Sequence, residues 1–192
     1  MLLVIQMEVL ISARVSNRHI HLNKETYELL FDSELTKKND LNQVGEFASN
    51  EFVTIKNGDK EIEGIRVVGP LRPYNQIEVS LTDARKLGLI PPVKRSGDVE
   101  DSLNITLKTN KGEVETNGLV LAKRHVHMNS SDAEKYGVSD KQVVKIKIDG
   151  ERSGVIDAEV KVSDNGFMEL HLDTDEANAF LIKDNDKVTM II

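Results

Sequence analysis

The chain of 192 residues contains no cysteine and no tryptophan, and aromatic residues make up only 4% of it. The absence of cysteine excludes disulfides, thiolate zinc sites and a cysteine nucleophile. No apolar run approaches the roughly 18 residues of a membrane span. The apolar start at residues 1–7 is short and is followed by Glu8, which argues against a signal peptide. Any bound metal must therefore be held by imidazole and carboxylate groups.

An excess of basic residues is also missing, because 25 basic and 32 acidic side chains give a formal net charge of -7. Proteins that bind nucleic acid usually show a basic excess or stripe, so we expect no nucleic-acid partner and no membrane partner. No nucleophile elbow, Walker loop or dinucleotide-binding glycine motif is present, which argues against serine-hydrolase, P-loop and Rossmann chemistry. The length suffices for one large or two small domains with a core.

All five histidines lie in motifs that are typical of metal ligands. The motifs are NRHIHLN at 17–23, KRHVHMN at 123–129 and ELHLD at 169–173. In an extended segment residues i and i+2 point to the same face, so each His-x-His pair can direct two imidazoles at one ion. A single pair would more often be a solvated strand face, but two copies favour metal binding. His125, His127 and His171 would form a three-imidazole set with an open position, as in catalytic zinc sites.

The other pair, His19 and His21, needs a third ligand. Glu78, Glu25 and Glu46 are candidates. The internal repeat favours Glu78, because its segment corresponds to the one that contains the fifth histidine.

That repeat predicts the architecture. RHIHLN at 18–23 recurs as RHVHMN at 124–129, a spacing of 106 residues. Hairpin signals such as Asn57-Gly58 separate β-rich runs, and short helices are expected at 24–31, 83–87, 132–136 and 175–180. We therefore predict a mainly β (α+β) fold of two similar small β-barrels, each capped by short helices, with both ligand sets facing a common cleft.

Several polar residues are candidates for substrate contact. Arg72 lies in a loop between two prolines, which is suited to holding an oxyanion such as phosphate. Arg18 and Arg124 flank the histidine pairs and could attract an anionic substrate. Ser96, in a glycine-containing loop, is a weaker candidate, since an ordinary turn is the better explanation of this segment.

Two other kinds of protein fit parts of the pattern. His19, His21 and Glu25 match the start of a cupin motif, although its glycines are missing and Glu25 falls in a predicted helix. A non-catalytic binding module stabilised by metal is the other alternative, and it predicts saturated coordination without turnover.

The motifs together resemble those of the PduL-type phosphate propanoyltransferases, which are phosphotransacylases. The resemblance extends from about Ile11 to the C-terminus. It is carried by VSNRHIHL at 15–22, GPLR at 69–72, QIEVSLTDAR at 76–85, KRHVHM at 123–128 and LHLDTDEANA at 170–179.

The resemblance implies conversion of acyl-CoA and phosphate to acyl phosphate and CoA, with propanoyl-CoA or acetyl-CoA as substrate. It implies two zinc ions per chain, one held by His19, His21 and Glu78 and the other by the three-histidine set, with phosphate bound by Arg72. It also implies a first barrel of residues 1–17 and 123–192, a second of residues 18–122, and a homodimer. The residues ahead of Val15 predict a strand rather than an encapsulation helix, so we expect a cytoplasmic enzyme of acetate or propanoate metabolism rather than a microcompartment protein.

Overall fold

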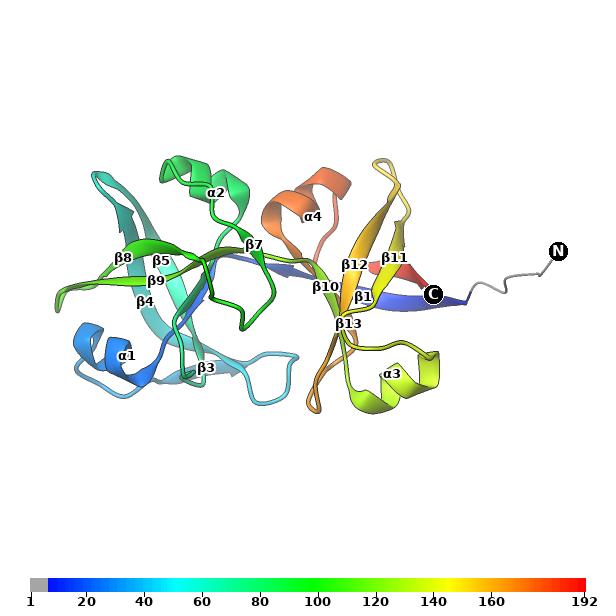
Figure 1. Cartoon of the computed structure of the whole chain (residues 1–192), viewed down its shortest axis with the longest axis horizontal. Coiled ribbons are helices and arrows are strands. Elements are labelled where there is room, and N and C mark those ends of the chain that lie inside the picture. Colours follow the sequence, from blue (N-terminus) through cyan, green and yellow to red (C-terminus); the bar gives the residue numbers. More distant parts are fainter. Residues whose placement is uncertain (1–6) are drawn as a thin grey trace. The chain divides into compact units, whose positions relative to one another are not determined.

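The computed structural model describes residues 7–192, and the chain divides into two compact units. Unit 1 comprises Met1–Ser16 and Arg124–Ile192, and unit 2 comprises Asn17–Lys123. Each unit is a closed ring of six β-strands with two short helices (Figure 1). The predicted mainly β fold of two similar barrels is confirmed.

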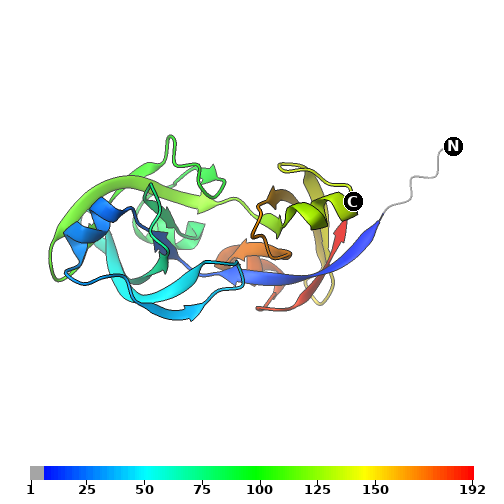
Figure 2. The same ribbon diagram turned by 90° about the horizontal axis from the view of Figure 1, so that it is seen from below.

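The barrel of unit 1 closes in the order β1-β13-β10-β12-β11-β14. Its first strand is the N-terminal one, which lies between β13 and β14, and Figure 2 shows the blue β1 beside the red β14. The strands are β1 (Glu8–Ser16), β10 (His125–Met128), β11 (Val143–Ile148), β12 (Gly154–Val162), β13 (Glu169–Asp173) and β14 (Lys187–Ile191).

The barrel of unit 2 closes through the pairings β4-β5-β2-β6-β9-β8, with β8 pairing back to β4. Two further strands, β3 and β7, extend it at β4 and β9. The strands are β2 (His19–His21), β3 (Lys37–Asp40), β4 (Phe47–Asn57), β5 (Lys60–Gly69), β6 (Gln76–Glu78), β7 (Val93–Lys94), β8 (Leu103–Lys108) and β9 (Glu113–Ala122).

The two barrels have the same strand pairings. Each His-x-His strand pairs in parallel with the second strand of the following hairpin, β5 or β12, and antiparallel with the next strand, β6 or β13. The closing strand, however, comes from elsewhere in the chain. β1 directly precedes β2 but belongs to unit 1, and β9 directly precedes β10 but belongs to unit 2. The two sequence repeats have therefore exchanged their first strands.

Strand alternation separates core from site in both units. Ile20 and Val126, at the centres of the two His-x-His motifs, are fully buried in the cores of their barrels. Complete burial of such a side chain contributes about 1.5–3 kcal/mol to folding. Because neighbouring residues on a strand face opposite sides, the histidines on either side point away from the core.

Short helices follow the ligand-bearing strands in each unit. In Figure 1, α2 and α4 lie above the strands of their own barrels, and α1 and α3 lie below. The helices are α1 (Lys24–Leu30), α2 (Leu81–Lys86), α3 (Ser130–Tyr136) and α4 (Thr174–Phe180). The side chains of Asn23 and Asp173 cap α1 and α4, each by accepting a hydrogen bond from a backbone amide in the first turn of its helix.

Two of the helices begin earlier than expected, α2 at Leu81 rather than at residue 83 and α3 at Ser130 rather than at residue 132. Ser80 caps α2, because its extended backbone lets its side chain accept a hydrogen bond from the amide of Asp83. Asn129 caps α3 in the same way, with its side chain accepting from the amide of Asp132. Only Val79 and Ser80 separate α2 from β6, and only Asn129 separates α3 from β10.

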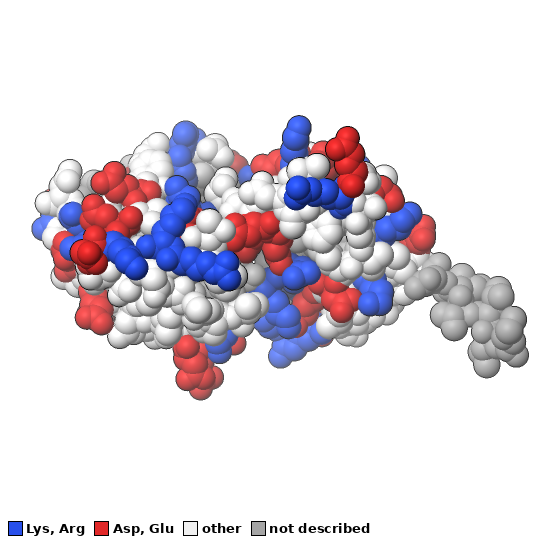
Figure 3. Space-filling view, turned by 90° about the horizontal axis from the view of Figure 1, so that it is seen from above, with Lys and Arg blue, Asp and Glu red and all other residues white. Residues whose placement is uncertain are grey.

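The surface carries charges of both signs. On the face shown in Figure 3, basic and acidic side chains are interspersed on each unit. Within residues 7–192, no helix has the length and apolar character needed to cross a membrane.

Candidate metal centres and their surroundings

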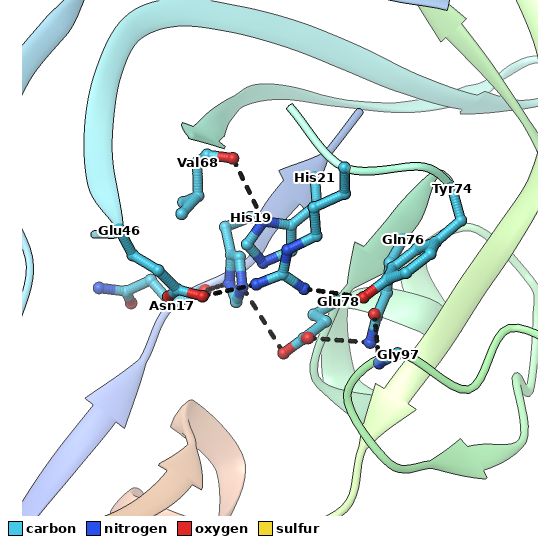
Figure 4. A network of polar contacts seen from close by, with 10 residues as sticks. Asn17, His19, His21, Glu46, Val68, Tyr74, Gln76, Glu78 and Gly97 are labelled. Carbon is cyan, nitrogen blue, oxygen red and sulfur yellow. Dashed lines mark hydrogen bonds and ion pairs between the residues drawn. The ribbon is translucent and has the colours of Figure 1, made fainter. Parts of the chain in front are cut away.

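Unit 2 brings together His19, His21 and Glu78, which the sequence predicted as one ligand set. The first two lie on β2 and the third on β6, and cross-strand pairing places His19 directly opposite Glu78. Their ligand atoms all lie within 4.8 Å of one another, and His19 Nε2 is 3.6 Å from Glu78 Oε2. Figure 4 shows the three side chains pointing toward one another.

Backbone carbonyls orient both rings of this set. His19 Nδ1 lies 2.8 Å from the carbonyl oxygen of Asn17, and His21 Nδ1 lies 3.2 Å from that of Val68. A carbonyl oxygen only accepts, so each Nδ1 carries the proton and donates. Each ring therefore keeps the lone pair of Nε2 for a metal ion, the arrangement in which a second hydrogen bond fixes the tautomer of a metal ligand.

Unit 1 brings together His125, His127 and His171 with the same strand geometry. The first two lie on β10, the third lies on β13, and His125 is directly opposite His171. The ligand nitrogens lie within 4.8 Å of one another, and the three ring centroids are 4.7–5.1 Å apart. Three imidazoles at this spacing are suited to a single ion.

A buried carboxylate contacts this set. Glu169 is only 2% exposed, and its Oε1 lies 2.8 Å from His171 Nε2. A buried glutamate without a partner would be costly, and the N–H of His171 is one partner of Glu169.

The donor chemistry of both sets fits zinc. Imidazole nitrogen and carboxylate oxygen are standard zinc ligands, and three protein ligands leave a coordination position for a substrate. The other two candidates for the third ligand of unit 2 do not belong to the converging set. Glu25 is exposed on α1, and Glu46 forms an ion pair with Arg72. The cupin-type combination of His19, His21 and Glu25 is therefore not assembled.

Arg72 lies in the loop between β5 and β6, and its side chain is only 17% exposed. Its Nη2 is 2.6 Å from Glu46 Oε1, and its Nη1 is 3.5 Å from the Tyr74 hydroxyl. The backbone amide of Arg72 also donates to the carbonyl of Leu22, which is the residue after His21. The arginine loop is thus attached to the end of a ligand-bearing strand.

The loop of Ser96 is attached to the same set through a residue that sequence reasoning missed. The amide of Gly97 donates to Gln76 Oε1 at 2.8 Å, and Gln76 Nε2 donates to Glu78 Oε1 at 3.0 Å. Gln76 is fully buried. The signal that could have identified it is its position two residues before a ligand on the same strand, which places both side chains on one face.

Arg18 and Arg124 form ion pairs with the helices that follow the third ligands. Arg18 Nη1 is 3.2 Å from Asp83 Oδ2 on α2, and Arg124 Nε is 2.6 Å from Glu176 Oε1 on α4. Burial raises the pKa of Glu176 above its ordinary value, and Arg124 opposes that shift. Each arginine directly precedes a His-x-His pair, and its ion pair links that end of the strand to a helix. Their predicted contact with substrate stays a prediction.

Comparison with known proteins agrees with these features. The family model described as phosphate propanoyltransferase matches residues 12–183. Curated phosphate propanoyltransferases are similar over most of their length: that of Clostridioides difficile is 44% identical (91% of this chain and 86% of the relative), that of Thermotoga maritima 43% (92% and 87%) and that of Priestia megaterium 48% (90% and 81%). The match to the family model and the identity to these relatives show that the chain belongs to the phosphate propanoyltransferase family.

Proposed function

We propose that this protein is a phosphate acyltransferase that converts a short-chain acyl-CoA and inorganic phosphate to acyl phosphate and CoA. Propanoyl-CoA and acetyl-CoA are the proposed acyl donors. Membership of the family supports the reaction class. The observation that carries the proposal is the presence of two converging ligand sets, each with three protein ligands.

The proposal includes two zinc ions per chain. His19, His21 and Glu78 would hold one of them, and His125, His127 and His171 would hold the other. Bound zinc would supply Lewis-acid stabilisation of negative charge on reacting oxygen and of the departing thiolate. The protein's own contribution is to hold the ligands in place before the ion arrives, which its carbonyl and carboxylate contacts support.

Arg72 is the proposed phosphate-binding residue. A guanidinium has five N–H donors in a planar fork, and the ion pair with Glu46 uses only one edge of it. The half-buried position weakens competition from water, so a contact with phosphate is stronger than it would be on an open surface. Holding phosphate beside the thioester removes much of the entropic cost of a two-substrate reaction.

Direct attack of phosphate on the thioester carbonyl is the proposed chemistry. The carbon–sulfur bond breaks, CoA leaves as the thiolate, and the acyl group is transferred to a phosphate oxygen. The chain has no cysteine to form an acyl-enzyme. Rapid quenching should therefore reveal no acyl-protein, and a stoichiometric burst of acylated protein would contradict the direct route. A homodimer in the cytoplasm stays a prediction, which sedimentation and cell fractionation test.

The test of the function is CoA thiol release by the zinc-loaded protein from propanoyl-CoA and acetyl-CoA, with and without phosphate. Release that requires phosphate is the expected result, and the ratio of the two rates ranks the acyl groups. Release without phosphate would instead identify a thioesterase. No release despite bound zinc would favour a different acyl group or the binding-module alternative.

The role of Arg72 has its own test. Arg72→Ala should raise the KM for phosphate while leaving the KM for acyl-CoA nearly unchanged. Loss of a buried charged contact costs roughly 2–5 kcal/mol. Arg152→Ala, which removes an exposed arginine on a turn of unit 1, is the matched control. An unchanged phosphate dependence in Arg72→Ala would refute the assignment.

A further inference from the structure

A second layer of matched side chains lies beside the ligand sets. In each unit, one buried polar residue precedes the third ligand by two positions on the same strand. Gln76 precedes Glu78 on β6, and Glu169 precedes His171 on β13. Each lies opposite the second histidine of its unit, Gln76 across from His21 and the glutamate across from His127. The two residues thus occupy equivalent places in the two barrels.

Their chemistry is matched to the ligand that each one contacts. In unit 2 the ligand is a carboxylate, and Gln76 donates an amide N–H to it. In unit 1 the ligand is an imidazole, and the neighbour is a carboxylate, Glu169, which accepts from His171 Nε2. A donor stands beside the acceptor ligand and an acceptor stands beside the donor ligand. Both residues are almost completely buried, so neither can exchange its partner for water.

We propose that Glu169 is a positioning residue that fixes the tautomer of His171, so that this histidine binds metal through Nδ1, whereas His19 and His21 bind through Nε2. The inference rests on the proposed metal site of unit 1. The hydrogen bond to Glu169 would hold the ring of His171 in a fixed orientation before the ion binds.

The nitrogen assignment follows from the contacts on each ring. A carboxylate accepts a hydrogen bond, so the proton of the neutral His171 ring is on Nε2 and the lone pair is on Nδ1. The carbonyl contacts of His19 and His21 are on Nδ1 and leave Nε2. The two sets therefore differ in the nitrogen they present as well as in the identity of the third ligand.

The first experiment needs no variant. Histidine-¹⁵N-labelled protein is loaded with ¹¹³Cd²⁺, and the coupled nitrogen of each ring is identified in long-range ¹H–¹⁵N spectra. Coupling to Nδ1 of His171 and to Nε2 of His19 and His21 is expected. Coupling to Nε2 of His171 would overturn the inference while leaving the proposed function intact. A protein that binds no metal at either set would overturn the metal part of the proposed function, and this inference with it.

The second experiment separates the hydrogen bond of Glu169 from its charge. Glu169→Met removes the acceptor, whereas Glu169→Gln retains an acceptor oxygen and removes the charge. In chelator competition, Glu169→Met should weaken one of the two zinc sites by about 10–100-fold and Glu169→Gln by less. Glu134→Gln, which removes an exposed glutamate of the same unit, should leave both affinities unchanged. Wild-type zinc affinity in both Glu169 variants would overturn the inference, and Glu169→Gln provides the readout if Glu169→Met does not fold.

Discussion

At the third ligand position, unit 1 has an imidazole and unit 2 has a carboxylate, although the two barrels place that position in the same cross-strand register. The neighbouring residue changes with it, from Glu169 in unit 1 to Gln76 in unit 2. Ligand and neighbour together contribute one carboxylate in each unit. Strand pairing therefore determines where the side chains lie, whereas the third ligand and its neighbouring residue together determine the chemistry of each site.

A second position separates the units further. Glu159 on β12 lies opposite His125, whereas Arg66 on β5 occupies the same place opposite His19. The guanidinium of Arg66 lies 4.3 Å from the ring centroid of Phe52 and also contacts the carbonyl of Ser49. The residue opposite the first histidine of the pair is therefore acidic in unit 1 and basic in unit 2.

Removal of the third ligand from either unit should have the largest effect on zinc content and activity. Glu78→Ala and His171→Ala should each reduce bound zinc from two ions to one per chain. Each should also lower phosphate-dependent thiol release by on the order of 10²–10³-fold, the usual loss when a preorganised charge-stabilising group is removed. Elemental analysis and thiol release measure the two effects, with Glu134→Ala on the surface of α3 as the control. A variant that retains two ions would show that its residue is not a ligand.

An exchange of ligand types in unit 2 tests whether the third ligand and its neighbouring residue are energetically coupled. Glu78→His alone places an imidazole beside the amide of Gln76, so zinc affinity at that site should fall by about 10–100-fold. The double variant Gln76→Glu/Glu78→His reproduces the pair found in unit 1 and should recover much of the loss. Chelator competition measures both variants. A double variant no better than the single one would show that the two positions are not coupled.

Local sequence signals predicted much of this structure. The turn signal at Asn57-Gly58 predicted the hairpin of β4 and β5. The period-two spacing of the histidines predicted that each pair would face one ion, because strand geometry alone determines it. Convergence of Glu78 and His171 with those pairs followed from the repeat.

Long-range pairing and buried polar contacts could not be predicted in this way. Nothing in the alternating pattern of β1 or β9 specifies which barrel each strand completes, since alternation determines only which face is buried. Gln76 and Glu169 were overlooked because a polar residue in a strand most often faces solvent. Only the fold reveals that these two are enclosed beside a ligand.

Loss of the arginine that pairs with a helix, Arg18 in unit 2 or Arg124 in unit 1, should have a smaller effect, on the free energy of unfolding. Asp83 keeps a second ion pair, with Lys86 at 3.0 Å, whereas within residues 7–192 Glu176 pairs with Arg124 alone. Arg124→Met should therefore lower the free energy of unfolding by about 1 kcal/mol and Arg18→Met by about half as much, since both arginines are partly exposed. Urea unfolding measures the change. A raised KM for phosphate or acyl-CoA with no loss of stability would instead favour the predicted contact with substrate.

The smallest effect concerns the pH dependence of unit 1. Burial raises the folded-state pKa of Glu176, with Arg124 opposing the shift. A carboxyl whose pKa is higher in the folded protein holds its proton more tightly there. Its favourable contribution is complete below the unfolded pKa and is lost as the pH rises through the folded pKa. Glu176→Gln lacks this titration, so its unfolding free energy relative to wild type should increase from acidic toward neutral pH, by less than about 1 kcal/mol. Urea unfolding of both proteins at several pH values measures the slope, and a difference that decreases toward neutral pH would show that Arg124, rather than burial, dominates at this glutamate.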